Sequence, residues 1–242
     1  VFDGRLHPEM WGAGAMSDLY PLWMLKYLPN MVACHIAITE DARGPNNTIT
    51  LDEVSSLLAL VESVCYIQRG AADVMVAGGQ GSRINLTRIL YRGDVYWSHR
   101  NEEPERACRP FDAHRDGGVI GEGAGAFILE SRRHAEARGA NILARVLGFG
   151  RSFDHAPGHH GAGVDGLRRA IEGALASAGL EPAGIGHVNA HGMSEIEADR
   201  LEAEAIRRCL GDVPVTAPKS YFGCLGAGTG AVEMAASVMA IA

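Results

Sequence analysis

One segment, residues 44–79, constrains the fold more than any other part of the chain. It begins with a short β-prone stretch at 47–50, and apolar residues at helical spacing then predict a helix from about Leu51 to Arg69. The next apolar run, 72–77, is bounded by glycines, which is typical of a strand buried on both faces of a sheet. The segment therefore predicts a strand, a tight turn, a long buried helix and a second strand.

Similar alternation extends through the rest of the chain. We expect a strand and a helix in each of the stretches 127–138 and 142–179, then a strand at 185–190 and a final helix at 226–241. Strands that alternate with helices predict an α/β fold with parallel βαβ units. The pattern starts again near residue 140, so we expect two units, 1–140 and 141–242.

Composition narrows the class of protein. Apolar residues make up 47% of the 242 residues and charged residues 21%, as in ordinary globular domains. A net charge of −7 argues against a nucleic-acid partner. No uninterrupted apolar run reaches the length of a membrane span and Val1 opens no signal peptide, so we expect a cytoplasmic protein with no membrane partner.

The cysteines and histidines give no pattern typical of metal or redox sites. The five cysteines are widely separated and form no C-x-x-C pair: Cys34, Cys65, Cys108, Cys209 and Cys224. We therefore expect reduced thiols, no metal and no cofactor. The glycine-rich stretch 117–125 lacks the G-x-x-x-x-G-K-[ST] pattern of a phosphate loop, so we expect it to let backbones approach closely.

Four motifs follow one another along the chain. They are G-P-N (44–46) with A-D-V-M-V-A-G-G (72–79), R-P-F-D (109–112) with D-G-G-V-I-G-E-G-A-G (116–125), N-A-H-G (189–192), and K-S (219–220) with G-C-L-G-A-G-T-G-A-V-E (223–233). In these motifs the sequence resembles the β-ketoacyl-acyl carrier protein synthases, the condensing enzymes of fatty acid and polyketide synthesis. The resemblance covers about 28–242 and implies a thiolase-like αβαβα five-layered sandwich. It also implies that the fold is partial at both ends, before Val1 and after Ala242.

The resemblance assigns roles to individual residues, and several depart from the family pattern. Glu53 stands in place of the catalytic cysteine, at a helix N-terminus suited to a nucleophile. His191 matches one catalytic histidine, whereas Cys224 replaces the other. Met193 and Glu195 occupy the places of threonines that hold the pantetheine arm, and they lack the hydroxyl donors for it.

Four further residues match the supporting positions of the family. Lys219 and Glu233 stand where the family keeps an ion network around its site. Asp199 and Glu202 are three residues apart, a spacing that places both carboxylates on one face of a helix. We expect all four to support the site.

Glu53 has two interpretations. Thr50 and Glu53 fit the S/T-x-x-E capping box, in which Glu53 would cap the helix and do no chemistry. Alternatively, Glu53 is a catalytic carboxylate. Cys224, activated by His191, is a third candidate for the reacting group.

The altered site suggests a subunit without condensing activity. We expect this chain to resemble the chain length factors, which lack the cysteine, and to pair with an active ketosynthase. The stretch from Ala72 to Gly79 matches the strand through which family members form hetero- or homodimers, and an acyl carrier protein is a further expected partner. The alternatives are a malonyl-carrier-protein decarboxylase and a divergent active synthase. Residues 81–105, which include Arg83, predict a surface excursion that either docks a partner or is a solvated loop.

Overall fold

The structure is a computed structural model that describes residues 22–85, 96–154 and 163–242, together with positions 12, 14, 17, 18 and 20. The chain divides into two compact units, 1–50 and 51–242. The first unit contains the 3₁₀ helix η1 (Trp23–Tyr27) and the helix α2 (Met31–Thr39). The β-prone stretch 47–50 forms no strand, so that prediction is wrong.

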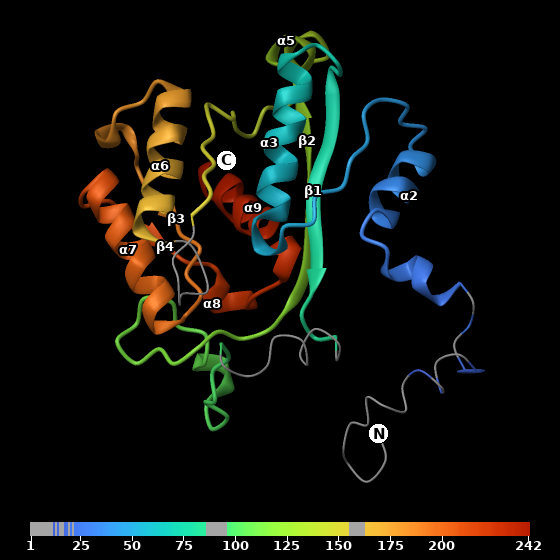
Figure 1. Ribbon diagram of the computed structural model, residues 1–242. Helices are drawn as coiled ribbons and strands as arrows, with labels where there is room; N and C mark the ends of the chain where they lie inside the picture. Colours follow the sequence, from blue (N-terminus) through green and yellow to red (C-terminus); the bar gives the residue numbers. More distant parts are fainter. Residues whose placement is uncertain are drawn as a thin grey trace. The chain divides into compact units, whose positions relative to one another are not determined.

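The second unit begins with the helix and strand predicted from residues 51–79. A 3₁₀ turn, η2 (Asp52–Val54), leads into α3 (Ser55–Gln68), and β1 (Val74–Ser82) follows. After η3 (Pro104–Arg106) come β2 (Glu122–Glu130) and α5 (Arg132–Ala137). Helix α3 contacts β1 and stands beside the sheet in Figure 1.

The strands pair differently from the prediction. β1 and β2 are antiparallel, with Val76 opposite Ile128, whereas the sequence predicts parallel units throughout. Helix α3 precedes β1 in the chain and α5 follows β2, so neither helix connects the two strands. The prediction holds only for β3 (Val188–Asn189) and β4 (Val215–Thr216), which are parallel.

The remaining helices follow α5 in the chain. They are α6 (Val164–Ala178), η4 (Pro182–Gly184), α7 (Ile196–Leu210), α8 (Lys219–Phe222), η5 (Gly226–Gly228) and α9 (Thr229–Ile241). Helices α6 and α7 contact each other and lie side by side in Figure 1. The predicted strand at 142–148 is not formed, because no ladder of hydrogen bonds pairs this stretch with a neighbour.

The inner face of the β1–β2 sheet packs against α3, η5 and α9, as the glycine-rich motifs predict. A Cβ atom on Gly79 would lie 2.7 Å from the carbonyl oxygen of Ala227, and one on Gly125 would lie 3.1 Å from the Cβ of Ala231. Ala77 and Ala231 are buried on this face. Glycine is required here because the helices approach the strands too closely for any side chain.

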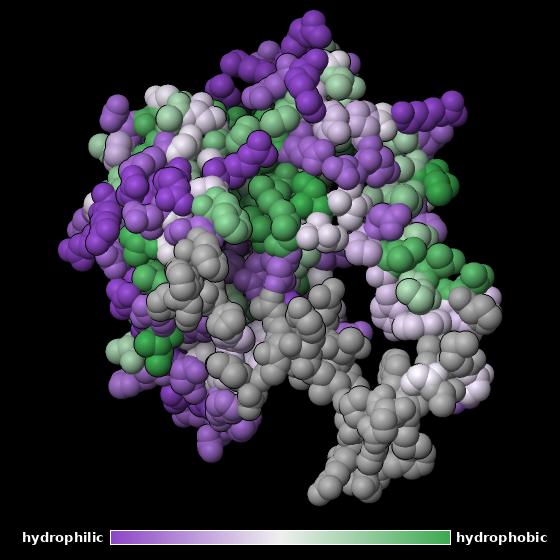
Figure 2. All heavy atoms as spheres, viewed as in Figure 1, coloured by the Kyte–Doolittle hydropathy of each residue, from purple (hydrophilic) through white to green (hydrophobic). Residues whose placement is uncertain are grey.

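The outer face of the same sheet is open in this chain. Val74, Val76 and Ile128 point to this face and are 41%, 45% and 60% exposed. The prediction of a strand buried on both faces is therefore wrong for the chain by itself. Figure 2 shows another apolar gathering, over α3 and α9 in the middle of the visible face.

Candidate functional site

The candidate site is built around His191, which follows the strand β3. Helix α7 holds the loop that carries this histidine, because Glu202 accepts hydrogen bonds from the backbone N–H groups of His191 and Gly192 at 2.7 and 2.8 Å. Asp199, one turn earlier, accepts from the backbone N–H of Met193 at 2.8 Å. The predicted placement of both carboxylates on one helix face is confirmed.

Lys219 and Glu233 support one side of the imidazole. The Nζ of Lys219 lies 2.9 Å from Nδ1 of His191 and forms a buried ion pair with Glu233. An ammonium group can only donate, so Nδ1 accepts and the proton of a neutral His191 ring lies on Nε2. Lys219 is only 1% exposed, which fixes the ring orientation from inside the protein.

Glu53 lies on the other side of the imidazole. Its Oε2 is 3.0 Å from Nε2 of His191, and its Oε1 receives the thiol of Cys224 at 3.0 Å. The Nη2 of Arg83 also contacts Oε1, at 3.2 Å. The site therefore brings the predicted residues Glu53, His191 and Cys224 together with a cation that we did not predict.

This geometry overturns the capping-box interpretation of Glu53. The N-terminal end of α3 has no side-chain cap, and Ser55 Oγ instead accepts from the backbone N–H of Leu51 at 2.8 Å. Glu53 points toward His191, because a buried carboxylate gains more from charged and hydrogen-bonding partners than from one backbone group. The sequence motif alone did not reveal these partners.

The surroundings of Glu53 favour its charged form. Burial by itself would raise the pKa of this carboxyl, but hydrogen bonds from His191 and Cys224 and the nearby charge of Arg83 lower the pKa to about 2. Glu53 is thus ionised at neutral pH. It acts as a hydrogen-bond acceptor for its neighbours and carries no proton to donate.

Cys224 lies in an environment that suppresses its reactivity. The residue is 1% exposed, and its burial together with the charge and hydrogen bond of Glu53 raises the thiol pKa to about 11. Only a thiolate is a good nucleophile. This arrangement argues against the hypothesis that Cys224 is a nucleophile activated by His191.

Arg83 is the residue of this site that sequence reasoning missed. We expected it in a surface excursion, but it is 4% exposed and pairs with Asp52 and Glu53. That expectation is wrong for Arg83, and residues 86–95 of the same excursion lie outside the described residues. Two adjacent carboxylates at a helix start were the available signal that a cation must lie nearby.

Met193 and Glu195 lie in the loop between His191 and α7. Met193 is buried, and Glu195 is the residue before α7, with its carbonyl oxygen accepting from Arg115 Nε at 3.0 Å. Their predicted effect on pantetheine binding stays a prediction.

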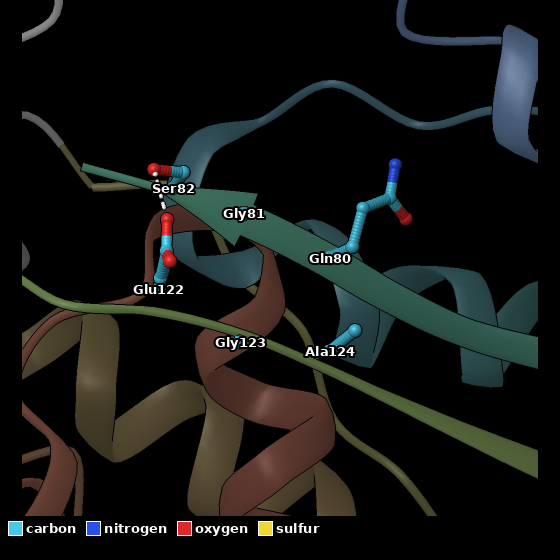
Figure 3. A pocket seen from close by; sticks show the side chains of 6 residues that line it. All are labelled: Gln80, Gly81, Ser82, Glu122, Gly123 and Ala124. Carbon is cyan, nitrogen blue, oxygen red and sulfur yellow. Dashed lines mark hydrogen bonds between the residues drawn. The ribbon is translucent and has the colours of Figure 1, made fainter. Parts of the chain in front are cut away.

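A hollow lies on the β1–β2 sheet, beside the end of β1 that leads to Arg83. It has a volume of about 530 Å³ and is lined by Gln80, Gly81, Ser82, Glu122, Gly123 and Ala124. Figure 3 shows the hydrogen bond from Ser82 to Glu122, 2.9 Å long, at one end of it.

The described part of the chain shows neither a metal-binding cluster nor a membrane-spanning helix. Among residues 22–85, 96–154 and 163–242, no group of three or more His, Cys, Asp or Glu side chains is arranged to hold a metal ion. No helix in these ranges has the length and apolar character needed to cross a bilayer.

Comparison with known proteins identifies the class that this fold and site define. Residues 7–135 match the N-terminal domain of beta-ketoacyl synthases, and residues 143–242 match their C-terminal domain. The chain has the thiolase-like fold and covers part of it. It belongs to the beta-ketoacyl synthase family.

Individual relatives agree with this membership. The chain is 39% identical over 232 residues to 3-oxoacyl-[acyl-carrier-protein] synthase 2 of Rhizobium meliloti, which aligns with 91% of this chain and 54% of the relative. A beta-ketoacyl synthase from Burkholderia phymatum is similar in structure, with a TM-score of 0.88 and 32% identity over 96% of this chain and 57% of that one. The ishigamide ketosynthase/chain length factor has a TM-score of 0.85 and 29% identity, with the same coverage. The chain thus spans about half the length of these relatives.

Proposed function

We propose that this chain is a condensation-inactive ketosynthase-like subunit that pairs with an active β-ketoacyl synthase in fatty acid or polyketide elongation. The observation that carries the proposal is the set of contacts that Glu53 makes with Arg83, His191 and Cys224 as an ionised carboxylate. The sequence resemblance assigns Glu53 to the family's nucleophile position, and these contacts support the proposal that it does no condensing chemistry there. The role resembles that of a chain length factor, which shapes the product made by its partner.

The chemistry of condensation explains why this substitution matters. A thiolate stores the acyl group as a reactive but long-lived thioester, whereas a carboxylate would form a mixed anhydride that water hydrolyses. The family also uses two histidines as hydrogen-bond donors to a developing negative charge, each worth about 3 kcal/mol. Cys224 stands in place of one of them, and its thiol donates to Glu53. Nucleophile and donor are therefore altered together.

The outer face of the β1–β2 sheet is the surface we assign to the partner. It presents Val74, Val76 and Ile128 to solvent, and β1 contains most of the stretch from Ala72 to Gly79 that the sequence analysis assigns to dimer formation. Apolar residues in the centre of an interface are typical of stable pairs. The variant Val76→Lys should abolish co-purification with the ketosynthase, whereas Ile196→Lys, on a residue that is 65% exposed on α7, should not.

A malonyl-carrier-protein decarboxylase is the second candidate. The observation that favours it is His191, whose imidazole keeps its support from Lys219 and Glu233 while its side chain remains 41% exposed. A supported and accessible histidine can stabilise the enolate that forms when carbon dioxide leaves. Decarboxylation needs no acyl-enzyme, so the loss of the cysteine does not exclude it.

An activity assay on the intact protein separates these two functions. Malonyl-carrier-protein decarboxylation and condensation would be measured for the protein alone and co-purified with a ketosynthase, in wild type, Glu53→Ala, His191→Ala and the surface control Glu136→Ala. The proposal predicts no turnover by the protein alone and products from the pair in all four forms. Decarboxylation by the isolated protein that disappears in Glu53→Ala or His191→Ala would instead make it an enzyme in its own right.

A further inference from the structure

Arg83 is a buried cation directly after the end of β1. Its side chain is 5% exposed, and its Nη2 contacts the carboxylates of both Asp52 and Glu53. Its backbone N–H donates to the carbonyl oxygen of Gly121 at 2.9 Å. Arg83 therefore ties the end of the sheet to the two acidic residues that precede α3.

Close packing holds the guanidinium in one position. A Cβ atom on Gly226 would lie 2.8 Å from Nε of Arg83, and this Nε is buried without a hydrogen-bond partner in the described structure. An uncompensated buried charge costs several kcal/mol, so the guanidinium depends on its two carboxylates.

The contact with Arg83 determines which oxygen of Glu53 meets His191. Arg83 and Cys224 both approach Oε1, which leaves Oε2 to face Nε2 of His191. Lys219 lies against Nδ1, so Nε2 carries the one proton that the neutral ring can donate. Glu53 therefore engages that proton within the chain.

We propose that Arg83 is a positioning residue that holds the carboxylate of Glu53 against the Nε2–H group of His191. The chain's own carboxylate then accepts the hydrogen bond that this group could give to a substrate. The inference rests on the proposed function and deepens it. On this proposal the site lacks condensing activity for two reasons. Glu53 stands in place of the cysteine, and the Arg83–Glu53 pair also blocks the hydrogen-bond donor of the remaining histidine, His191. A negative oxygen from a substrate must displace Glu53 before it can reach this donor.

Nitrogen-15 NMR of histidine side chains in the intact protein tests the role of Arg83. The readout is the ¹H–¹⁵N cross-peak of His191 Nε2, assigned by its loss in His191→Asn. We expect the cross-peak in wild type, in Arg83→Lys, which keeps the charge, and in Arg132→Met, which removes an exposed arginine that pairs with Glu136. In Arg83→Met we expect it to disappear, because a released Glu53 lets the Nε2 proton exchange with water. An unchanged cross-peak in Arg83→Met would overturn the proposal.

A double-mutant cycle covers the case in which Arg83→Met folds poorly. Urea unfolding would be measured for Arg83→Gln, which removes the charge but keeps a polar side chain, for Glu53→Gln and for the double variant. We expect the effects of the two single variants on the unfolding equilibrium constant to be non-additive by at least about threefold, because the two side chains are in contact. Additive effects would count against the proposal. Neither experiment uses a carrier protein or a partner, so failure here is distinct from failure of the proposed function.

Discussion

The two sides of the His191 imidazole differ in how far they follow the family pattern. On the Nδ1 side, Lys219 and Glu233 match the supporting positions and make the contacts expected of them. On the Nε2 side, Glu53 and Cys224 stand where the resemblance drawn from the sequence places a cysteine and a histidine, and they contact each other. By that resemblance, the supporting side follows the family pattern and the Nε2 side departs from it.

The two sides of the imidazole also differ in how much they contribute to the stability of the fold. The Lys219–Glu233 pair is deeply buried, so removing either partner leaves an uncompensated charge in the interior. The groups on the Nε2 side compensate one another, because Arg83 balances Glu53 and the Cys224 thiol donates to it. The changed side can therefore lose its chemistry without leaving unpaired charges in the core.

The largest effect is expected from Lys219→Met. This variant leaves Glu233 without its cation and His191 without its anchor, and should lower the free energy of unfolding by roughly 3–5 kcal/mol. Urea denaturation measures the change. The double variant Lys219→Met/Glu233→Met is the control, and it should recover most of the loss because apolar side chains need no counter-ion. A loss below about 1 kcal/mol in the single variant would show that the Nδ1 side is not the structural one.

The next effect is the acid sensitivity that Glu53 gives to the fold. Its pKa falls from 4.5 to about 2 on folding, so its ionised form contributes up to about 3 kcal/mol of stability. Because the folded pKa is the lower one, this contribution is complete above about pH 5 and is lost as the pH falls toward 2. Unfolding measured from pH 6 to pH 2.5 should therefore show a shallower decline for Glu53→Gln than for wild type.

A second carboxylate, Glu130, contributes to the acid sensitivity of both wild type and Glu53→Gln. Hydrogen bonds from Arg138 and His134 also lower the pKa of Glu130 to about 2, and this group contributes to acid sensitivity in both proteins. Only the difference between wild type and Glu53→Gln reports on Glu53. Parallel curves would contradict the role given to its charge.

The smallest effect concerns the thiol of Cys224. Burial and the charge and hydrogen bond of Glu53 raise its pKa to about 11, so Glu53→Gln should lower that pKa and speed alkylation. The thiolate fraction rises about tenfold for each unit by which the pKa falls. Peptide-level mass spectrometry after timed iodoacetamide treatment at pH 8 measures the rate, with Cys65 on α3 as an internal reference. Equal alkylation rates of Cys224 in wild type and Glu53→Gln would contradict the proposal that Glu53 raises the pKa of this thiol.

Much of the fold could be predicted from local patterns. The helix beginning near residue 51, the strand after it and the glycine packing follow from apolar spacing and from the steric demands of close backbone contact. Helix geometry alone predicts that the carboxylates of Asp199 and Glu202 lie on one face of α7, and both accept backbone hydrogen bonds from the loop that carries His191. Strand direction could not be read in the same way, because it depends on how residues 83–121 return the chain to β1.

The Nε2 side of the site was harder to predict, because its contacts join residues distant in sequence. Arg83 lies 30 residues from Glu53 in the sequence, and arginine is usually exposed unless a counter-ion is buried with it. Glu53 also satisfied a local motif for helix capping, and only the positions of Arg83, His191 and Cys224 show that tertiary contacts prevail. The reactivity of Cys224 likewise depends on Glu53, which is 171 residues away in the sequence.

Intact-protein mass spectrometry tests most directly whether the chain lacks a working nucleophile. The protein would be incubated with an acyl-carrier-protein thioester, with Glu53→Cys as a control in which the family's thiol returns. We predict no added acyl mass on the wild-type chain, because Glu53 is held as a carboxylate and Cys224 is a buried, protonated thiol. A stable acyl adduct on the wild-type chain, at Cys224 or at any other residue, would contradict the account.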